Sequence, residues 1–474
     1  MTTGQEQAGT ADRATQHRQA VERLLASYRA IPGSATVRLA KRTSNLFRPR
    51  GRNDAPGLDV DGLDGVLAVD PQARTADVQG MCTYEHLVEA TLEHGLMPQV
   101  VPQLRTITLG GAVTGLGIES TSLWQGLPHE SVLEMDVLTG DGRLLTVRPG
   151  EHEDLMRGFP NSYGTLGYTT RLRIELAPVQ PYVALRHVRF DDPESLAQAV
   201  ARIADEGSWD SQRVDFVDGV MFSTEELYLT LGRWADRAEH VSDYTGQQVF
   251  YRSLRDRRED TLTVHDYLWR WDTDWFWCSR AFGAQHPVLR RVWPRRWRRS
   301  DVYHRLVRLE DRLRLAARVD RARGRPERER VIQDVEVPVS QTAGFLRWFS
   351  EHVGMDPVWL CPLRLRGDGG PLGTLSVGER PWPLYPLQAG QVYVNVGFWG
   401  TVPIEPGARD GDVNRRVEDA VSSFGGHKAL YSDAYYDEDT FWAAYGGSTY
   451  GDLKRRYDPG QRLLGLYDKA VRRR

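Results

Sequence analysis

The chain has 474 residues, of which 40% are hydrophobic and 26% charged, and its formal net charge is -3. This length predicts two or three domains, and the near-balanced charge excludes nucleic-acid binding through bulk charge. The three cysteines, Cys82, Cys278 and Cys361, follow no metal-site or disulfide spacing, so we expect a reduced, cytoplasmic setting and no metal. No apolar run is long enough for a transmembrane helix or a signal peptide, so any contact with the inner face of the membrane is expected to be peripheral.

The N-terminal part predicts a mixed α+β unit with short strands. Residues 1–12 are small and polar and predict a disordered tail, and apolar residues at helical spacing predict a helix over 13–30. The strand-like runs "GVLAVD" and "TADVQG" precede a helix for which Thr83 is the expected N-cap. Asp141-Gly142 between two apolar runs predicts a β-hairpin.

The pattern changes near residue 181. Residues 181–425 hold two copies of a strand-helix-strand-strand pattern, which predicts an antiparallel sheet backed by helices. A Trp- and Arg-rich insertion over 250–330 separates the copies. Its tryptophans predict either core or an acyl-chain tunnel: Trp269, Trp271, Trp275 and Trp277. Its basic stretch, 290–330, predicts either an amphipathic helix at a lipid surface or a solvated helix paired to its own acids.

The most distinctive stretch is "TLGGAVTGLGIESTS", residues 108–122. It does not fit the dinucleotide fingerprint GxGxxG or the phosphate loop GxxxxGK[ST]. Its glycines are explained equally by a tight packing bend or by backbone amides that contact an anion or a ring.

The order of segments around this stretch resembles the FAD-binding domain of the vanillyl-alcohol-oxidase (PCMH-type) flavoproteins. The matching runs are "VLAVDP", "RTADVQG", the glycine stretch, "LEMDVLTGDG" and "GTLGYTTRLRIEL". The resemblance implies an α+β fold: a two-subdomain FAD-binding domain over 13–180, a substrate (cap) domain over 181–425 with helices on one face of its sheet, and a C-terminal segment, 426–474, that returns to the flavin. It also implies FAD contacts for Thr108, Leu109, Gly110, Gly111, Thr114, Gly115, Gly117, Ile118, Glu119, Ser120, Gly164, Thr165 and Gly167.

The first phosphate loop departs from that family. Many members carry a glycine-rich loop there, often with a histidine that bonds covalently to the flavin. Here the place is occupied by "KRTSNLFRPRG", in which Ser44, Asn45 and Arg48 offer donors to a pyrophosphate. The missing histidine implies non-covalent FAD.

Runs along nearly the whole sequence are similar to the sterol Δ24-reductase branch, among them "IQDVEVP", "YVNVGFWG" and "ALYSDAYYDEDTFW". That branch uses FAD and NADPH to saturate an isolated double bond in the side chain of a sterol. The actinobacterial 10-methylene fatty acyl reductases of tuberculostearic acid synthesis resemble this protein in the same way. The absence of an N-terminal anchor favours this bacterial reading, in which a phospholipid acyl chain is reduced.

An isolated alkene must be protonated as hydride arrives, so the reaction needs an acid in an apolar pocket. The candidates are Tyr431, which leads, Glu119 and Lys428. The competing reading of Tyr431 is a buried tyrosine bonded to backbone, and that of Glu119 is a carboxylate bound to ribose or to loop amides. Three alternatives stay open: a sterol Δ24-reductase, an alcohol or sugar oxidase or dehydrogenase, and a non-catalytic flavin-binding partner of a lipid methyltransferase.

Overall fold

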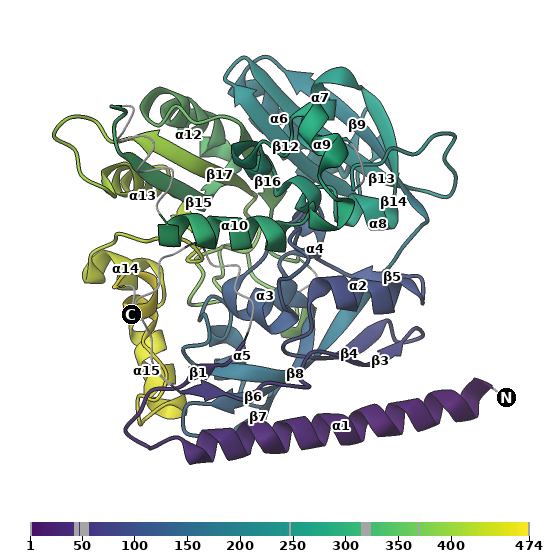
Figure 1. Ribbon diagram of the computed structural model, residues 1–474, viewed down its shortest axis with the longest axis vertical. Helices are drawn as coiled ribbons and strands as arrows, with labels where there is room; N and C mark the ends of the chain where they lie inside the picture. The colour runs from purple at the N-terminus through teal and green to yellow at the C-terminus, as the bar shows by residue number, and fades with distance from the viewer. Residues whose placement is uncertain are drawn as a thin grey trace.

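The protein contains two large β-sheets, one in the N-terminal domain and one in the domain that follows it (Figure 1). The computed structural model describes residues 2–41, 47, 56–245, 248–313, 324–367 and 370–472. No helix in these ranges combines the length and the apolar character that a membrane span requires.

The first sheet has six strands in the order β3-β4-β8-β6-β7, with β5 paired to β8. Its strands are β3 (Val66–Asp70), β4 (Thr75–Gln79), β5 (Leu96–Pro98), β6 (Val132–Thr139), β7 (Leu144–Val147) and β8 (Gly167–Pro178). The expected hairpin at Asp141-Gly142 is confirmed: β6 and β7 are antiparallel, and Gly142 has a φ of 84°. Beside the sheet lie a short parallel pair and short helices: β1 (Arg38–Leu39), β2 (Gly57–Leu58), α2 (Tyr84–Leu92), α3 (Leu109–Gly115), α4 (Ser122–Gln125), η1 (Pro128–Ser131) and α5 (Glu153–Gly158). Thr83 caps α2, as predicted, by accepting from the His86 amide.

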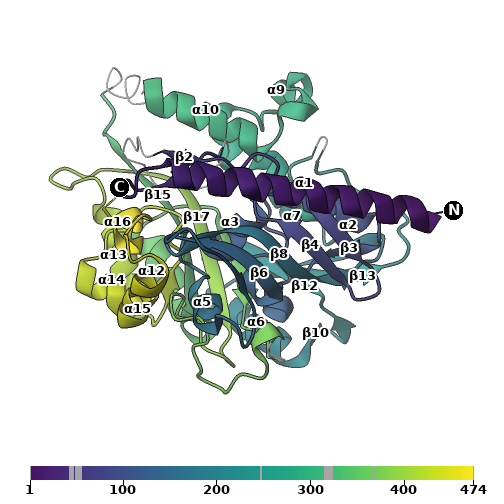
Figure 2. The ribbon, with the colours of Figure 1, turned by 90° about the horizontal axis from the view of Figure 1, so that it is seen from below.

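The first helix, α1 (Thr2–Ala30), runs along the outside of this sheet (Figures 1 and 2). Leu24 and Tyr28 pack with Leu58 and Leu138 in a small apolar cluster. The segment expected as a disordered tail, 1–12, differs from the prediction, because the helix begins at Thr2. The physical reason is that the Gln, Glu and Ala residues of this segment favour a helix and no proline interrupts it.

The second sheet has eight antiparallel strands in the order β14-β9-β13-β12-β16-β17-β15-β18. They are β9 (Tyr182–Phe190), β12 (Phe216–Ser223), β13 (Glu226–Ala235), β14 (Glu259–Thr263), β15 (Arg328–Pro338), β16 (Val358–Leu363), β17 (Tyr393–Pro403) and β18 (His427–Lys428). The two predicted strand-helix-strand-strand units are β9-α6-β12-β13 and β15-α12-β16-β17, and they meet where β12 pairs with β16. The predicted α+β class, with an FAD-binding domain and a large antiparallel sheet, is confirmed.

Helices cover one face of this sheet: α6 (Pro193–Glu206), α12 (Val339–His352) and α13 (Asp412–Ser423). Val335 and Val337 of β15 pack against this layer with Phe345 of α12. Since side chains alternate along a strand, Asp334 and Glu336 point to the other face, toward the first domain. That inner face carries the polar groups of the candidate site.

The insertion and the C-terminal segment complete the fold. The insertion contains α7 (Phe250–Asp256), α8 (Val264–Leu268), η2 (Asp272–Asp274), η3 (Cys278–Phe282), α9 (Pro287–Val292), η4 (Arg295–Trp297) and α10 (Ser300–Leu313). Figure 2 shows α9 and α10 at one edge of the molecule. The remaining elements are β10 (Ser208–Trp209), β11 (Gln212–Arg213), η5 (Gly370–Leu372), α14 (Glu438–Ala444), α15 (Gly447–Tyr457) and α16 (Leu466–Ala470).

Candidate functional site

The glycine stretch begins with the short helix α3. Thr108 caps it by accepting a hydrogen bond from the Gly111 amide at 3.2 Å. A Cβ at Gly110 would lie 2.6 Å from the Gly80 carbonyl oxygen and even closer to Thr169 Oγ1. Gly110 is therefore required by the packing of α3 against the sheet, which supports the packing reading at this position.

Farther along, the stretch is open. Residues 114–118 form a continuous half-exposed run between buried segments, and Leu116 within it has a φ of 65°. A Cβ at Gly117 would lie 2.9 Å from Pro102 Cγ, so the backbone here has little room for a side chain. Gly117 is therefore also explained by packing, and only the half-exposed part of the run could be approached by a ligand.

The second expected cofactor segment, 164–167, lies beside the first. Tyr163 joins them: its amide donates to the Thr114 carbonyl at 2.9 Å, and its hydroxyl donates to the Gly115 carbonyl at 2.9 Å. Gly164 has a φ of 73°, a backbone conformation that favours glycine. Gly167 instead belongs to the sheet, since a Cβ there would lie 2.6 Å from Val137 Cγ1. The other expected contacts in these segments remain predictions.

Ser44, Asn45 and Arg48 lie outside the described residues, so their cofactor contacts also stay predictions. Phe47, between them, is described. Its amide donates to the Tyr431 carbonyl at 3.1 Å, and its ring lies 5.8 Å from the Tyr431 ring. The expected phosphate loop and the C-terminal segment therefore meet at this point.

Glu119 is held in a buried ionic cluster. Its Oε1 accepts from Arg270 Nη2 at 2.8 Å and from Ser120 Oγ at 2.8 Å, and Gln103 donates to its Oε2. Arg270 also donates to Asp218 Oδ2 at 2.9 Å. Both Glu119 oxygens have partners, so the geometry favours the carboxylate bound by its surroundings over the proton donor.

The Lys428 side chain is also held by fixed partners. Its ammonium is buried and donates to Glu418 Oε1 at 3.0 Å and to the Asp433 carbonyl. The ammonium is therefore fixed by these two partners. The geometry gives Lys428 the role of holding α13 to the C-terminal segment.

Tyr431 lies against the inner face of the second sheet. Its hydroxyl accepts from Trp399 Nε1 at 2.9 Å and lies beside the Asp334 carboxyl group, which accepts from Asn395 Nδ2 at 3.0 Å. Burial raises the pKa of Asp334 to about 6, although the neighbouring Asn395 and Tyr431 side chains oppose this shift. Burial, and then the Asp334 charge, raise the pKa of Tyr431 well above its ordinary value. The pair can therefore retain a proton near neutral pH.

Asp334 is missing from the residues that the sequence singled out. The signal was present: Asp334 and Glu336 alternate with valines in a strand, which places two carboxyl groups on the same face of the sheet. Glu336 lies beside the Tyr385 hydroxyl and 3.5 Å from His427 Nε2, and burial raises its pKa well above the ordinary range.

Aromatic rings surround Trp399, whose indole donates to the Tyr431 hydroxyl. Phe276 stacks on Trp399 at 4.5 Å, and Trp277 and Trp359 lie 5.4 and 6.3 Å from it. The expected cluster of four insertion tryptophans is buried, and its members contribute to the apolar clusters, as the core alternative predicts. The acid pair thus faces an apolar, water-poor wall.

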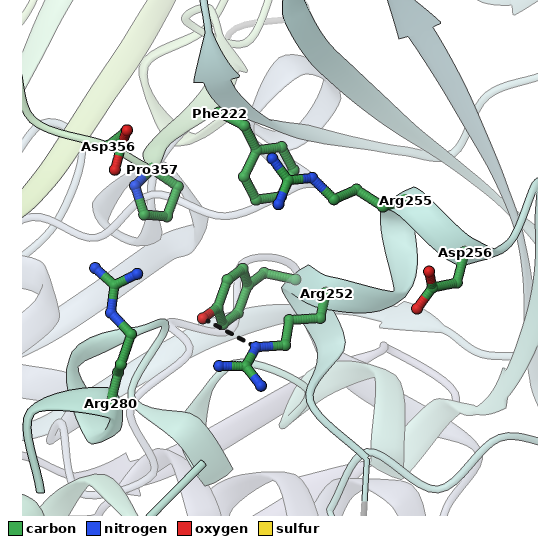
Figure 3. A pocket seen from close by; sticks show the side chains of 8 residues that line it. Phe222, Arg252, Arg255, Asp256, Arg280, Asp356 and Pro357 are labelled. Carbon is green, nitrogen blue, oxygen red and sulfur yellow. Dashed lines mark hydrogen bonds between the residues drawn. The ribbon is translucent and has the colours of Figure 1, made fainter. Parts of the chain in front are cut away.

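A separate cavity of about 460 Å³ lies beside the insertion (Figure 3). Arg252, Arg255 and Arg280 line it together with Phe222 and Tyr251. Arg255 is paired with Glu226 at 2.7 Å. None of the residues predicted for the flavin or the acid lines this cavity.

The first domain matches a known family. Residues 21–148 match the family described as FAD binding domain. This match contains the whole glycine stretch and supports FAD as the cofactor. It ends before residues 164–167.

Similarity to known proteins covers most of the sequence. The Delta(24)-sterol reductase of Homo sapiens is 26% identical over 429 residues, which are 86% of this chain and 77% of the human protein. The Delta(24)-sterol reductase of Arabidopsis thaliana is 24% identical over 446 residues, 88% of this chain and 77% of that protein. Cytokinin dehydrogenase 5 of Arabidopsis thaliana is 31% identical over only 189 residues, 37% of this chain and 33% of that protein. The similarity to the sterol reductases is thus distant but extends through both domains.

Proposed function

We propose that the protein is an FAD-dependent reductase of an isolated C=C bond in a lipid, with NADPH as the electron donor. The observation that carries the proposal is the Asp334–Tyr431 pair, which sits against Trp399 on the face of the sheet that looks toward the FAD-binding domain. The similarity to Delta(24)-sterol reductases supports a sterol as substrate. The resemblance to 10-methylene fatty acyl reductases supports a second substrate, a branched acyl chain.

The residues present fit FAD. The half-exposed run 114–118 is partly open to solvent, so a ligand could reach its backbone. Two buried polar atoms near this run, Gln103 Oε1 and Ser162 Oγ, have no hydrogen-bond partner among the described residues. Reduced FAD, when bound, supplies the hydride.

The protein's own residues supply the proton. An isolated trisubstituted or 1,1-disubstituted alkene gives a tertiary cation on protonation, so the proton must arrive at one carbon as hydride reaches the other. The Tyr431 hydroxyl would give up its proton to the alkene and take another from the Asp334 carboxyl group, which water would later reprotonate. Phe276, Trp277 and Trp359 would exclude water, which would otherwise trap the cation.

The first test is anaerobic. NADPH should bleach the yellow protein, and a Δ24 sterol or a phospholipid with a 10-methylene chain should then gain two hydrogens, as seen by mass spectrometry. If only one of the two substrates gained hydrogen, that result would assign the substrate class. Absence of bleaching would contradict the proposal and favour an oxidase or a non-catalytic flavin protein.

The second test is Tyr431→Phe. The variant should bind FAD and be bleached by NADPH as the wild type is, yet lose about 10²- to 10⁴-fold in product formation, the range for a positioned acid. Turnover at the wild-type rate would remove Tyr431 from the mechanism.

A further inference from the structure

The exposed large apolar side chains are concentrated in the insertion. Five of the eight such side chains in the described part of the protein lie within residues 288–309. Three are on the single helix α9: Val288 is 64% exposed, Leu289 47% and Val292 73%. Trp297 of η4 is 49% exposed. Apolar side chains gathered in this way mark an interaction surface rather than random exposure.

The same surface is basic. No Asp or Glu occurs between Asp274 and Asp301, whereas the interval holds seven arginines: Arg280, Arg290, Arg291, Arg295, Arg296, Arg298 and Arg299. Exposed arginines alternate with the apolar side chains on α9 and η4: Arg291, Arg295 and Arg296. The Arg296 guanidinium lies 5.8 Å from the Trp297 ring centroid.

Buried arginines hold this surface in place. Arg290 donates to Asp274 Oδ1 at 2.6 Å and to the Gln248 carbonyl at 2.7 Å, and Arg298 donates to the carbonyls of Arg290 and Trp293. The inward side of α9 is therefore fixed by charge and hydrogen bonds. The outward apolar side chains have no comparable layer over them among the described residues.

The basic character continues beyond α9. A surface hollow of about 460 Å³ is lined by Pro287, Arg290 and Arg291, and also by Arg252 and Asp256, which it shares with the cavity of Figure 3. That cavity adds Arg280, and it also holds the acid Asp356. Arginines thus outnumber acids along the flank of the apolar patch.

We propose that α9 and η4 dock the protein on the surface of an anionic lipid bilayer. Val288, Leu289 and Val292 would enter the interfacial region, Trp297 would lie at the headgroup level, and the exposed arginines would contact lipid phosphates. Apolar and cationic side chains are interleaved on one short helix, so the partner must offer apolar and anionic contacts side by side. An anionic bilayer does this better than an acidic protein. The biological purpose of this docking surface rests on the proposed function, because a reductase of a membrane lipid must reach the bilayer.

The test is sedimentation of the full-length, FAD-loaded protein with vesicles at low salt. The vesicles are phosphatidylcholine alone, or phosphatidylcholine and phosphatidylglycerol in equal parts. The wild type should bind the anionic vesicles and bind the neutral ones at least about tenfold more weakly. No binding to anionic vesicles, or equal binding to both, would overturn the proposal.

Variants locate the surface. Val288→Asp with Val292→Asp should weaken binding at least about tenfold, whereas Val377→Asp, at a side chain 89% exposed outside the insertion, should not change it. Replacing Arg291, Arg295 and Arg296 by Gln should weaken binding about a hundredfold, whereas Arg213→Gln with Arg455→Gln should have a small effect. Equal losses in the control variants would overturn the assignment.

If the double aspartate variant does not fold, the single change Val292→Ser serves in its place, with Val377→Ser as its control. These measurements require neither NADPH nor turnover. A protein that binds anionic vesicles but reduces no lipid would therefore contradict the proposed function and leave the docking surface standing. An active enzyme that never binds vesicles would contradict the docking surface and leave the proposed function standing.

Discussion

Arg270, in the insertion, lies 2.8 Å from the Glu119 carboxylate at the end of the glycine stretch. The same guanidinium reaches Asp218 of β12 at 2.9 Å, and Asp218 also accepts from the indoles of Trp271 and Trp359 at 3.0 and 3.2 Å. All three charged groups are buried. The cluster therefore ties the expected flavin-binding segment to the large sheet.

Replacement of Arg270 by Met should destabilise the protein strongly. Two buried carboxylates would lose their counter-ion, and such a loss costs about 3–5 kcal/mol in the free energy of unfolding. Urea unfolding followed by tryptophan fluorescence would measure it. Arg456→Met, which breaks a largely exposed pair with Asp154, is the matched control and should cost about 1 kcal/mol or less. Equal effects would show that the buried cluster does not join the domains.

Gly110→Ala should destabilise the packing of α3. The new Cβ would collide with the Thr169 hydroxyl and with the Gly80 carbonyl, and the carbonyl is backbone that cannot move without shifting the chain beside the sheet. We expect a loss of about 1–3 kcal/mol in stability, with weaker retention of FAD as judged by the flavin absorbance of the purified protein. Gly33→Ala is the control, because nothing lies within 4 Å of its Cβ, and it should be near neutral.

The local features of the fold could be predicted from the sequence. The hairpin at Asp141-Gly142 and the cap at Thr83 depend on residues close together in the sequence, and short-range rules describe them well. The repeated strand-helix-strand-strand pattern also predicted one antiparallel sheet backed by helices. The start of α1 was misjudged, because small polar residues suit both a tail and a helix end.

The partners of the site residues could not be predicted. Glu119 and Arg270 are 151 residues apart, and Lys428 meets Glu418 through the packing of α13 on the sheet. A sequence pattern gives the chemical type of a residue but not which distant charge neutralises it. The acid Asp334 was missed for the same reason, since only the position of Tyr431 in space makes that carboxyl group significant.

Lys428→Met should lower stability and spare the chemistry. Glu418 would remain buried without its cation, which predicts a loss of about 3–5 kcal/mol. The fraction of protein that retains FAD should nevertheless form product at close to the wild-type rate. Single-turnover measurements, normalised to bound flavin, would decide this. A stable, flavin-loaded variant without turnover would restore Lys428 as a catalytic candidate.

The pH dependence of turnover should identify Asp334. Its carboxyl group, whose pKa burial raises to about 6, is mostly protonated below that pH and mostly ionised above it. Because the proposed relay uses the protonated form, kcat should be constant below pH 6 and should fall about tenfold per unit above it. Above pH 6 the ionised Asp334 would also hold the Tyr431 proton more tightly, which acts in the same direction.

Asp334→Asn should remove this dependence together with most of the activity, while NADPH still bleaches the flavin. Glu336→Gln is the matched control: the residue lies two positions along the same strand and on the same face, but it is directed toward Tyr385 and His427 rather than Tyr431. That variant should keep the decline near pH 6. If instead Glu336→Gln removed the decline and Asp334→Asn kept it, the proton would come from Glu336, and the Asp334–Tyr431 pair would have only a structural role.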